Sequence, residues 1–251
     1  MELWISVPWL VVAFGLMLLL HRWLEAHLQG LACLITGHPR VAVWMFFIVF
    51  LPGTLVHELS HWLMAKLLGV RTGRLEIWPQ EKRDGAVWLG SIQVGRADPL
   101  RSSLIGLAPL LVGSVVAAMI GGHLQLDTLG SALAGGDWPA FWQRLGRSIA
   151  LPDVWLWVYL LFSIANRMLP SPADRHAWRP VIIFLAIVSA GVVASGWTPQ
   201  LAPDARNVLR DVVGFLLYAF TVIVGVDILV ALVVAVTEAI AGLVRGQRIS
   251  Y

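Results

Sequence analysis

The sequence contains few charged residues. Of its 251 residues, 13% are Asp, Glu, Lys or Arg, whereas 58% are hydrophobic. Soluble globular domains carry about 25% charged residues and about 45–50% apolar ones. So little charge excludes a soluble enzyme, a disordered chain and a nucleic-acid-binding protein. The composition instead fits a polytopic membrane protein with short loops.

Cysteine is scarce as well. Cys33 is the only cysteine, which excludes an intrachain disulfide. The net charge of +3 does not indicate a nucleic-acid partner, because the basic residues flank apolar stretches. Length and composition leave no room for an appended soluble domain. We therefore expect a single membrane domain over residues 1–251.

Long apolar stretches are what the sequence has in abundance. A bilayer core about 30 Å thick requires roughly 20 apolar helical residues. The pattern predicts an all-α polytopic membrane protein in which Pro52-Gly53 bends or breaks the second span. The six predicted transmembrane helices are 3–20, 41–68, 102–121, 154–169, 181–197 and 212–244.

The connections between these spans indicate their orientation. One side of the membrane collects about twice as many Lys and Arg residues as the other, which predicts that both termini are cytoplasmic. We expect an integral multi-pass protein of the cell (plasma) membrane. In the longest connection, 69–101, apolar and polar residues alternate on both sides of Asp84-Gly85. This pattern predicts a short membrane-associated β-hairpin over residues 75–94.

The second span contains the pattern H-E-x-x-H at residues 57–61. Residues four apart lie on one face of a helix, so His57 and His61 can bind one Zn²⁺. Glu58 can then act as a base toward water at the metal. Ionisable residues inside a bilayer are functional candidates by default. The alternative is a purely structural role, in which these residues form a hydrogen-bonded polar cluster that joins helices.

A zinc hydrolase site requires a third protein ligand. The fourth span runs toward the same membrane face as the H-E-x-x-H pattern, and Pro170 and Pro172 end it. Asp174, which follows them, can thus reach the metal, although an N-cap of the next helix suits it equally well. His123 lies at the opposite face and is disfavoured. The remaining candidate ligands are His176, Asp227 and Glu238.

These motifs together resemble the site-2 protease family of intramembrane zinc metalloproteases. In that family a later span reads approximately N-x-x-P-x-P-x-x-D-G, and its Asp is the third zinc ligand. Asn166 and Asp174 have the family's spacing, and the resemblance covers about residues 41–180, which would form the zinc core. The two prolines stand one position late, Arg175 replaces the Gly, and the 69–101 connection is too short for a PDZ-type insertion. These departures indicate a minimal or divergent member.

The resemblance implies a hydrolase with a metal-binding site, acting in intramembrane proteolysis. His57, His61 and Asp174 would hold Zn²⁺, and Glu58 would serve as the catalytic base. Asn166 would be a polar group near the substrate backbone or the oxyanion. The substrate would be a transmembrane-helix protein in the lipid bilayer, held extended at an edge of the 75–94 hairpin by strand addition.

Two other function classes compete with a metalloprotease. One is a non-catalytic metal- or partner-binding relative, against which the intact Glu58 argues. The other is an ion or metal transporter, which inverted repeats would favour, and the sequence shows no second copy of the motif. Asp227, in the sixth span, is either a gate, a proton path or a partner contact, or simply hydrogen-bonded inside the bundle. The sequence defines neither the oligomeric state nor the substrate.

Overall fold

The computed structural model is a helical bundle with one small hairpin. It describes residues 3–81, 87–171 and 202–245, together with Asp174, Trp178 and five positions between 181 and 190. Helices account for most of these residues, and the two strands form one antiparallel sheet. The elements are α1 (Leu3–Thr36), α2 (Pro39–Leu67), β1 (Thr72–Glu81), β2 (Val87–Val94), α3 (Pro99–His123), α4 (Leu126–Ala134), α5 (Trp138–Ile149), α6 (Val154–Arg167) and α8 (Pro203–Arg245).

Four of the described helices are long and apolar enough to cross a membrane. They are α1, α2, α3 and α8, and the pair α5 and α6 makes a fifth if it counts as one bent span. The chain is therefore a membrane protein by the length and composition of its helices. The predicted span 181–197 lies outside the described residues, so six spans are not confirmed.

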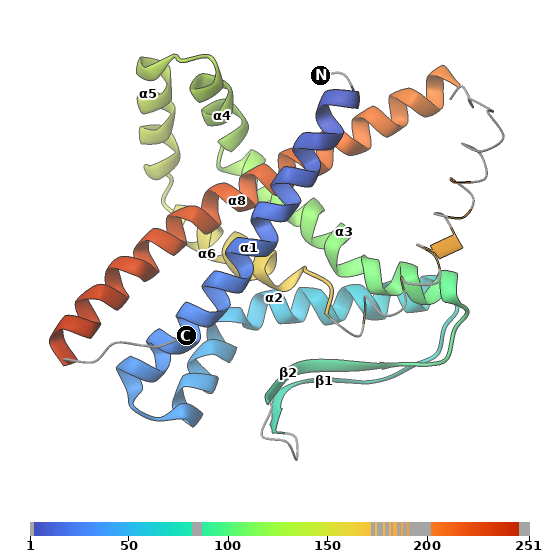
Figure 1. Cartoon of the computed structure of the whole chain (residues 1–251), viewed down its shortest axis with the longest axis horizontal. Helices are drawn as coiled ribbons and strands as arrows, with labels where there is room; N and C mark the ends of the chain where they lie inside the picture. Colours follow the sequence, from blue (N-terminus) through green and yellow to red (C-terminus); the bar gives the residue numbers. More distant parts are fainter. Residues whose placement is uncertain are drawn as a thin grey trace.

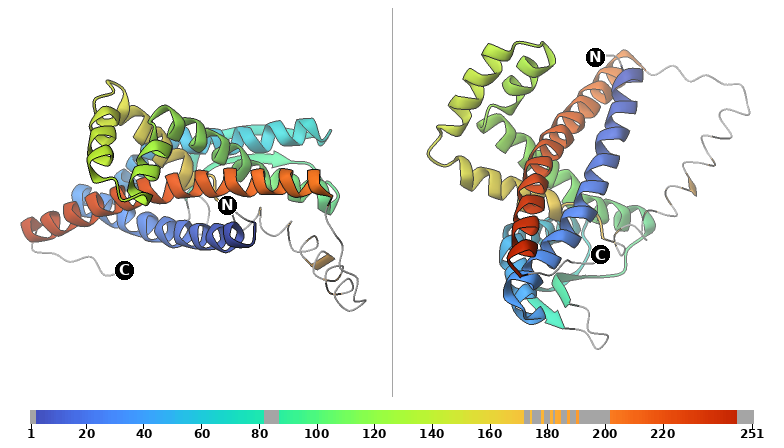
Figure 2. Two further views of the ribbon diagram at one scale, coloured as in Figure 1. Left: turned by 90° about the horizontal axis from the view of Figure 1, so that it is seen from above. Right: turned by 60° about the vertical axis from the view of Figure 1, so that its left-hand side comes forward.

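The first and last helices are longer than predicted, and their directions do not fit six spans. α1 continues to Thr36 instead of ending near residue 20, and α8 begins at Pro203 instead of 212. Six alternating spans would make the first and the last antiparallel. α1 and α8 instead lie side by side and run in the same direction (Figures 1 and 2). The described helices thus do not support placing both termini on one side.

The core lies where α1, α2, α3, α6 and α8 meet. Its fully buried side chains come from all five helices, whereas large apolar side chains on the outer faces stay exposed, as expected for surfaces that contact lipid. The largest of the fully buried apolar side chains are Met17, Leu24, Leu124, Leu161, Met168 and Ile223.

Pro52 does not break α2, contrary to one of the two expectations for it. A proline has no N–H to donate to the carbonyl four residues earlier, here that of Ile48. The hydroxyl of Tyr159 in α6 donates to that carbonyl instead, over 3.3 Å. Because a neighbouring helix satisfies the freed group, α2 remains one helix from Pro39 to Leu67. Figure 1 shows that it bends between its first turns and the rest.

The predicted hairpin is present. β1 and β2 pair antiparallel with Leu75 opposite Ile92, and the ladder is irregular on both sides of Glu76. The turn residues 82–86 lie outside the described part of the chain. In Figure 1 the hairpin runs alongside α2. This places its backbone next to the helix that carries the H-E-x-x-H pattern.

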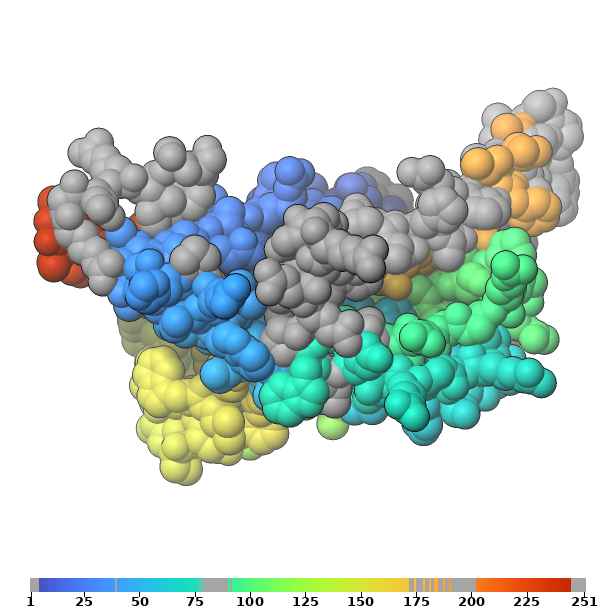
Figure 3. All heavy atoms as spheres, turned by 90° about the horizontal axis from the view of Figure 1, so that it is seen from below, coloured from blue at the N-terminus to red at the C-terminus, as the bar shows by residue number. Residues whose placement is uncertain are grey.

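α5 is an amphipathic helix at the edge of the molecule, where Figure 3 shows it in yellow. Trp138, Trp142 and Ile149 share one face of it and are all more than half exposed. Arg147 lies on the opposite face and is also exposed. The axes of α5 and α6 differ by 93°. The near-perpendicular angle to α6 and the separate apolar and basic faces favour an interfacial position for α5.

Candidate metal centre

α2 presents the H-E-x-x-H residues to α3 and α6. Gly53, one turn before His57, makes this close approach possible, because a Cβ at this position would lie 2.0 Å from the carbonyl oxygen of Ser163 in α6. The backbone N–H of Gly53 also donates to the Ser163 hydroxyl, over 3.0 Å. α2 and α6 therefore touch through their backbones at the level of the site.

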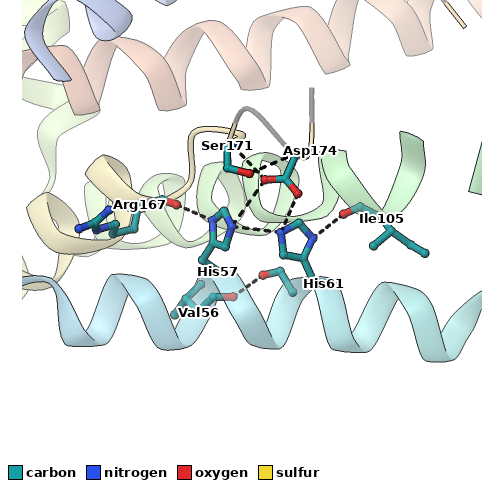
Figure 4. Close-up of polar contacts among 8 residues, drawn as sticks. Val56, His57, His61, Ile105, Arg167, Ser171 and Asp174 are labelled. Atoms are coloured by element: carbon teal, nitrogen blue, oxygen red, sulfur yellow. Dashed lines mark hydrogen bonds and ion pairs between the residues drawn. The ribbon is translucent and has the colours of Figure 1, made fainter. Parts of the chain in front are cut away.

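Both histidines use Nδ1 for a hydrogen bond to a backbone carbonyl of another helix. Nδ1 of His57 lies 2.6 Å from the carbonyl oxygen of Arg167, and Nδ1 of His61 lies 2.8 Å from that of Ile105 (Figure 4). A carbonyl oxygen can only accept, so each Nδ1 carries the proton. Each Nε2 then has its lone pair available for a metal.

The two accepting carbonyls are both free of an intrahelical partner. In α3 the residue four positions after Ile105 is Pro109, which has no N–H to offer that carbonyl. In α6 the last residue is Arg167, and four positions on, the N–H of Ser171 donates to Asp174 instead. The carbonyls of Ile105 and Arg167 thus lack a donor four positions on, and each lies within hydrogen-bonding distance of a histidine of α2.

Asp174 faces the two histidines. One carboxylate oxygen lies 3.3 Å from Nε2 of His61 and the other lies 3.9 Å from Nε2 of His57. The N–H of Ser171 donates to the carboxylate, and the Ser171 hydroxyl accepts from the N–H of Asp174. These two bonds tie Asp174 to Ser171, and the carboxylate faces the histidines of α2 (Figure 4). The residues immediately after Asp174, which an N-cap would serve, lie outside the described part of the chain.

The three side chains fit a metal ion. Their potential ligand atoms all lie within 4.8 Å of one another. The two Nε2 atoms are 3.0 Å apart. Because both histidines carry their proton on Nδ1, the lone pairs of the two Nε2 atoms face and repel each other. Tetrahedral zinc with Zn–N bonds of about 2.0–2.1 Å would hold two nitrogens about 3.3 Å apart. A cation between these atoms resolves a contact that neutral imidazoles alone leave unfavourable. The group His57, His61 and Asp174 could therefore hold a metal ion.

The other candidate ligands lie elsewhere or outside the described residues. His123 pairs with Asp153 at 3.6 Å, and Glu238 lies 2.6 Å from Nδ1 of His27. Asp227 contacts the side chain of Asn166. His176 lies outside the described residues.

Glu58 lies beside the histidines in a cavity of about 460 Å³. Its side chain is 8% exposed, and the backbone N–H of Ile92 in β2 donates to its carboxylate. Gly90, also in β2, permits this approach, because a Cβ there would lie 2.7 Å from the Thr54 side chain and 3.4 Å from a carboxylate oxygen of Glu58. The hairpin therefore contacts the candidate base directly.

Asn166 forms another wall of the same cavity, together with residues of α1. Its carboxamide nitrogen donates to the carbonyl of Phe162 over 3.0 Å and to a carboxylate oxygen of Asp227 over 2.8 Å. Its oxygen lies 3.3 Å from Nδ1 of His21. Asn166 thus connects the cavity with both α1 and α8.

Sequence reasoning missed two features of this cavity. His21 and Glu25 of α1 line it, because α1 continues beyond residue 20. Arg167 also lines it, with its guanidinium near the rings of Phe46 and Phe50 and one nitrogen 3.7 Å from Glu25. The i, i+4 spacing of His21 and Glu25 was the available signal. No family model, curated protein or solved structure matches the chain.

Proposed function

We propose that the chain is an intramembrane zinc metalloprotease of the site-2 protease type, which hydrolyses a peptide bond in or near a transmembrane segment of a membrane-protein substrate. One observation carries the proposal. Three potential ligand atoms from His57, His61 and Asp174 converge in a bundle of apolar helices. A carboxylate, Glu58, sits beside them in a cavity large enough for a peptide segment and water.

The metal set matches zinc in its chemistry. Two imidazole nitrogens and one carboxylate are a common catalytic zinc set, which leaves a fourth position open. When bound, a zinc ion supplies Lewis-acid polarisation of the scissile carbonyl and acidifies the attacking water. The carbonyls of Ile105 and Arg167 fix the ring orientation of the two histidines, as outer-shell partners do in zinc enzymes.

The protein's own groups carry the proton chemistry. Glu58 takes a proton from the water whose oxygen adds to the carbonyl carbon of the substrate. It then delivers that proton to the amide nitrogen as the C–N bond breaks. The products are a carboxylate and an amine, so the reaction consumes only water. Burial of Glu58 beside the histidines keeps this transfer inside the cavity and away from lipid.

The hairpin is the proposed binding element for the substrate. Its strand β2 reaches Glu58 through the N–H of Ile92, so a segment lying along β2 would pass the base and the metal site. Strand addition would hold such a segment extended, which peptide-bond hydrolysis requires of a helical substrate.

The first test is zinc content. Purified wild-type chain in detergent is expected to contain about one zinc ion per chain by elemental analysis, and Asp174→Ala should lose most of it. Glu58→Gln should keep the zinc, because Glu58 is not a ligand. Absence of zinc from chelator-free wild type would refute the proposal.

The second test is hydrolysis. The probe is a set of synthetic transmembrane peptides, each with about 20 apolar residues and a central Gly-Ser pair, in liposomes with the purified chain. Mass spectrometry should find two new termini with the wild type and none with Glu58→Gln. Glu238→Gln, the matched change on α8 away from the cavity, should cleave like the wild type. A transporter would leave every peptide intact while losing metal flux in Glu58→Gln.

A further inference from the structure

Asp227 has a specific partner that the mechanism above does not use. Its side chain is 1% exposed and lies in the middle of α8, a helix apolar enough to cross the membrane. A carboxylate in such a place is costly unless it is hydrogen-bonded. The described contact is the carboxamide nitrogen of Asn166 in α6, 2.8 Å from one carboxylate oxygen.

This contact settles which way the Asn166 carboxamide faces. The same nitrogen also lies 3.0 Å from the carbonyl oxygen of Phe162, and a carbonyl can only accept a hydrogen bond. Both N–H groups of Asn166 are thus used, one by Phe162 and one by Asp227. The carboxamide oxygen is left to face His21 and the cavity.

We propose that Asp227 is a positioning residue, which holds Asn166 so that its carboxamide oxygen accepts a hydrogen bond from a backbone N–H of the substrate. The proposal rests on the proposed protease function. It assigns Asn166 to the substrate backbone rather than to the oxyanion, because an oxyanion needs an N–H donor and both donors of Asn166 are engaged. His21, which now lies 3.3 Å from that oxygen, occupies the place that the substrate N–H takes.

Asp227 acts here as an acceptor and not as a proton carrier. It does not line the cavity, whereas Asn166 does. A terminal carboxamide rotates about a broad, nearly two-fold torsion, so Phe162 alone leaves Asn166 free to reorient. The second acceptor, on a different helix, removes that freedom.

The kinetic test distinguishes Asp227 as a hydrogen-bond acceptor for Asn166 from Asp227 as a proton carrier. Asp227→Asn keeps an oxygen that can accept from Asn166, and it should cleave the liposomal transmembrane peptides with nearly wild-type KM and kcat. Asp227→Ala removes the acceptor and should raise KM about two- to tenfold, the range expected for one hydrogen bond, while kcat changes less. Glu238→Ala removes a contact that α8 makes with a different helix, α1, and it should change neither KM nor kcat. Equal loss of kcat in Asp227→Asn and Asp227→Ala would overturn the positioning role in favour of proton transfer.

A second measurement does not depend on cleavage. The chain has only two asparagines, Asn166 and Asn207, so labelling with [¹⁵N]asparagine gives two side-chain NH₂ signals in an NMR spectrum. Asn207 lies exposed at the start of α8 and serves as the internal reference. Both protons of Asn166 should exchange with solvent far more slowly than those of Asn207, and Asp227→Ala should accelerate one of them at least tenfold. Zinc content, measured on each variant, controls for folding.

The two measurements distinguish failure of the inference from failure of the protease proposal. If the wild type cleaves no peptide but Asn166 exchange depends on Asp227, the protease function fails and the positioning contact stands. If the wild type cleaves and Asn166 exchanges as fast as Asn207, the positioning role is overturned.

Discussion

Gly53→Ala is expected to separate α2 from α6 and thereby weaken metal binding. A Cβ at this position would lie 2.0 Å from the carbonyl oxygen of Ser163 and 2.9 Å from the Cβ of Arg167. The first of these neighbours is backbone, so a side-chain rotation cannot relieve the contact. α6 must move by at least about 1 Å to bring it to 3.0 Å. Overpacking of this kind costs about 1–3 kcal/mol, and occasionally more.

The displacement matters because α6 also orients a candidate ligand. The carbonyl of Arg167 accepts from Nδ1 of His57 over 2.6 Å, and a shift of about 1 Å lengthens that contact beyond hydrogen-bonding range. Loss of an outer-shell partner lowers metal affinity about 10- to 100-fold. We therefore expect Gly53→Ala to lower both Tm and zinc affinity, although it replaces no ligand.

Zinc titration against a competing chelator and thermal unfolding in detergent measure both effects. Gly15→Ala and Gly225→Ala are matched controls in α1 and α8, because a Cβ at either position meets nothing within 4 Å. Alanine is the better helix former, so these variants should bind zinc normally and unfold no earlier than the wild type. A Gly53→Ala variant that matches them in Tm and zinc affinity would refute the reasoning.

Three further changes test other parts of the structure. Pro109→Ala restores an N–H that competes with His61 for the carbonyl of Ile105, so zinc affinity should fall up to tenfold without a loss of Tm. Unchanged zinc affinity would show that the Ile105 carbonyl accepts both hydrogen bonds. Ile92→Pro removes the N–H that β2 donates to the candidate base and should abolish peptide cleavage while zinc is retained, and persistent cleavage would remove the hairpin from the mechanism. In a Cys33→Ser background in lipid vesicles, a spin label at Trp142→Cys should be accessible to oxygen, which concentrates in lipid. A spin label at Arg147→Cys should be accessible to a water-soluble nickel complex. Equal accessibility at both positions would refute an interfacial α5.

The local parts of the site could be predicted from the sequence. The spacing of His57 and His61 determines a shared helix face, whatever surrounds it. Two prolines after α6 predict a chain that leaves the helix and returns, and Asp174 indeed lies beside both histidines. The hairpin follows from alternating residues around Asp84-Gly85, although that turn lies outside the described residues. The helix face, the end of α6 and the hairpin each depend on neighbours within about ten positions. The choice of Asp174 does not, because the residues alone left it one of five candidate ligands, to which an N-cap role suited it equally well.

Contacts between distant segments could not be predicted in this way. Pro52 was expected to bend or break α2, and it leaves the helix unbroken because Tyr159, more than a hundred residues away, satisfies the freed carbonyl. α1 was expected to end near residue 20, but it continues with His21 and Glu25 inside it because these side chains meet Asn166 and Arg167 across the bundle. Hydropathy counts such residues as the end of a span, whereas a polar cavity makes them part of it.

The orientation of the candidate ligands follows from gaps in backbone hydrogen bonding. A helix normally offers no carbonyl to a neighbour, because each one accepts from the residue four positions on. Pro109 cancels one such bond in the middle of α3, and the end of α6 before Pro170 cancels another. Histidines of α2 donate to both of these carbonyls. Either carbonyl would be costly if it stayed unpaired in an apolar bundle, and each one fixes the histidine tautomer that a metal requires. Helix packing therefore sets the orientation of both candidate ligands through two carbonyl groups. We expect a change that moves α3 or α6 relative to α2 to change zinc affinity even when every candidate ligand is intact.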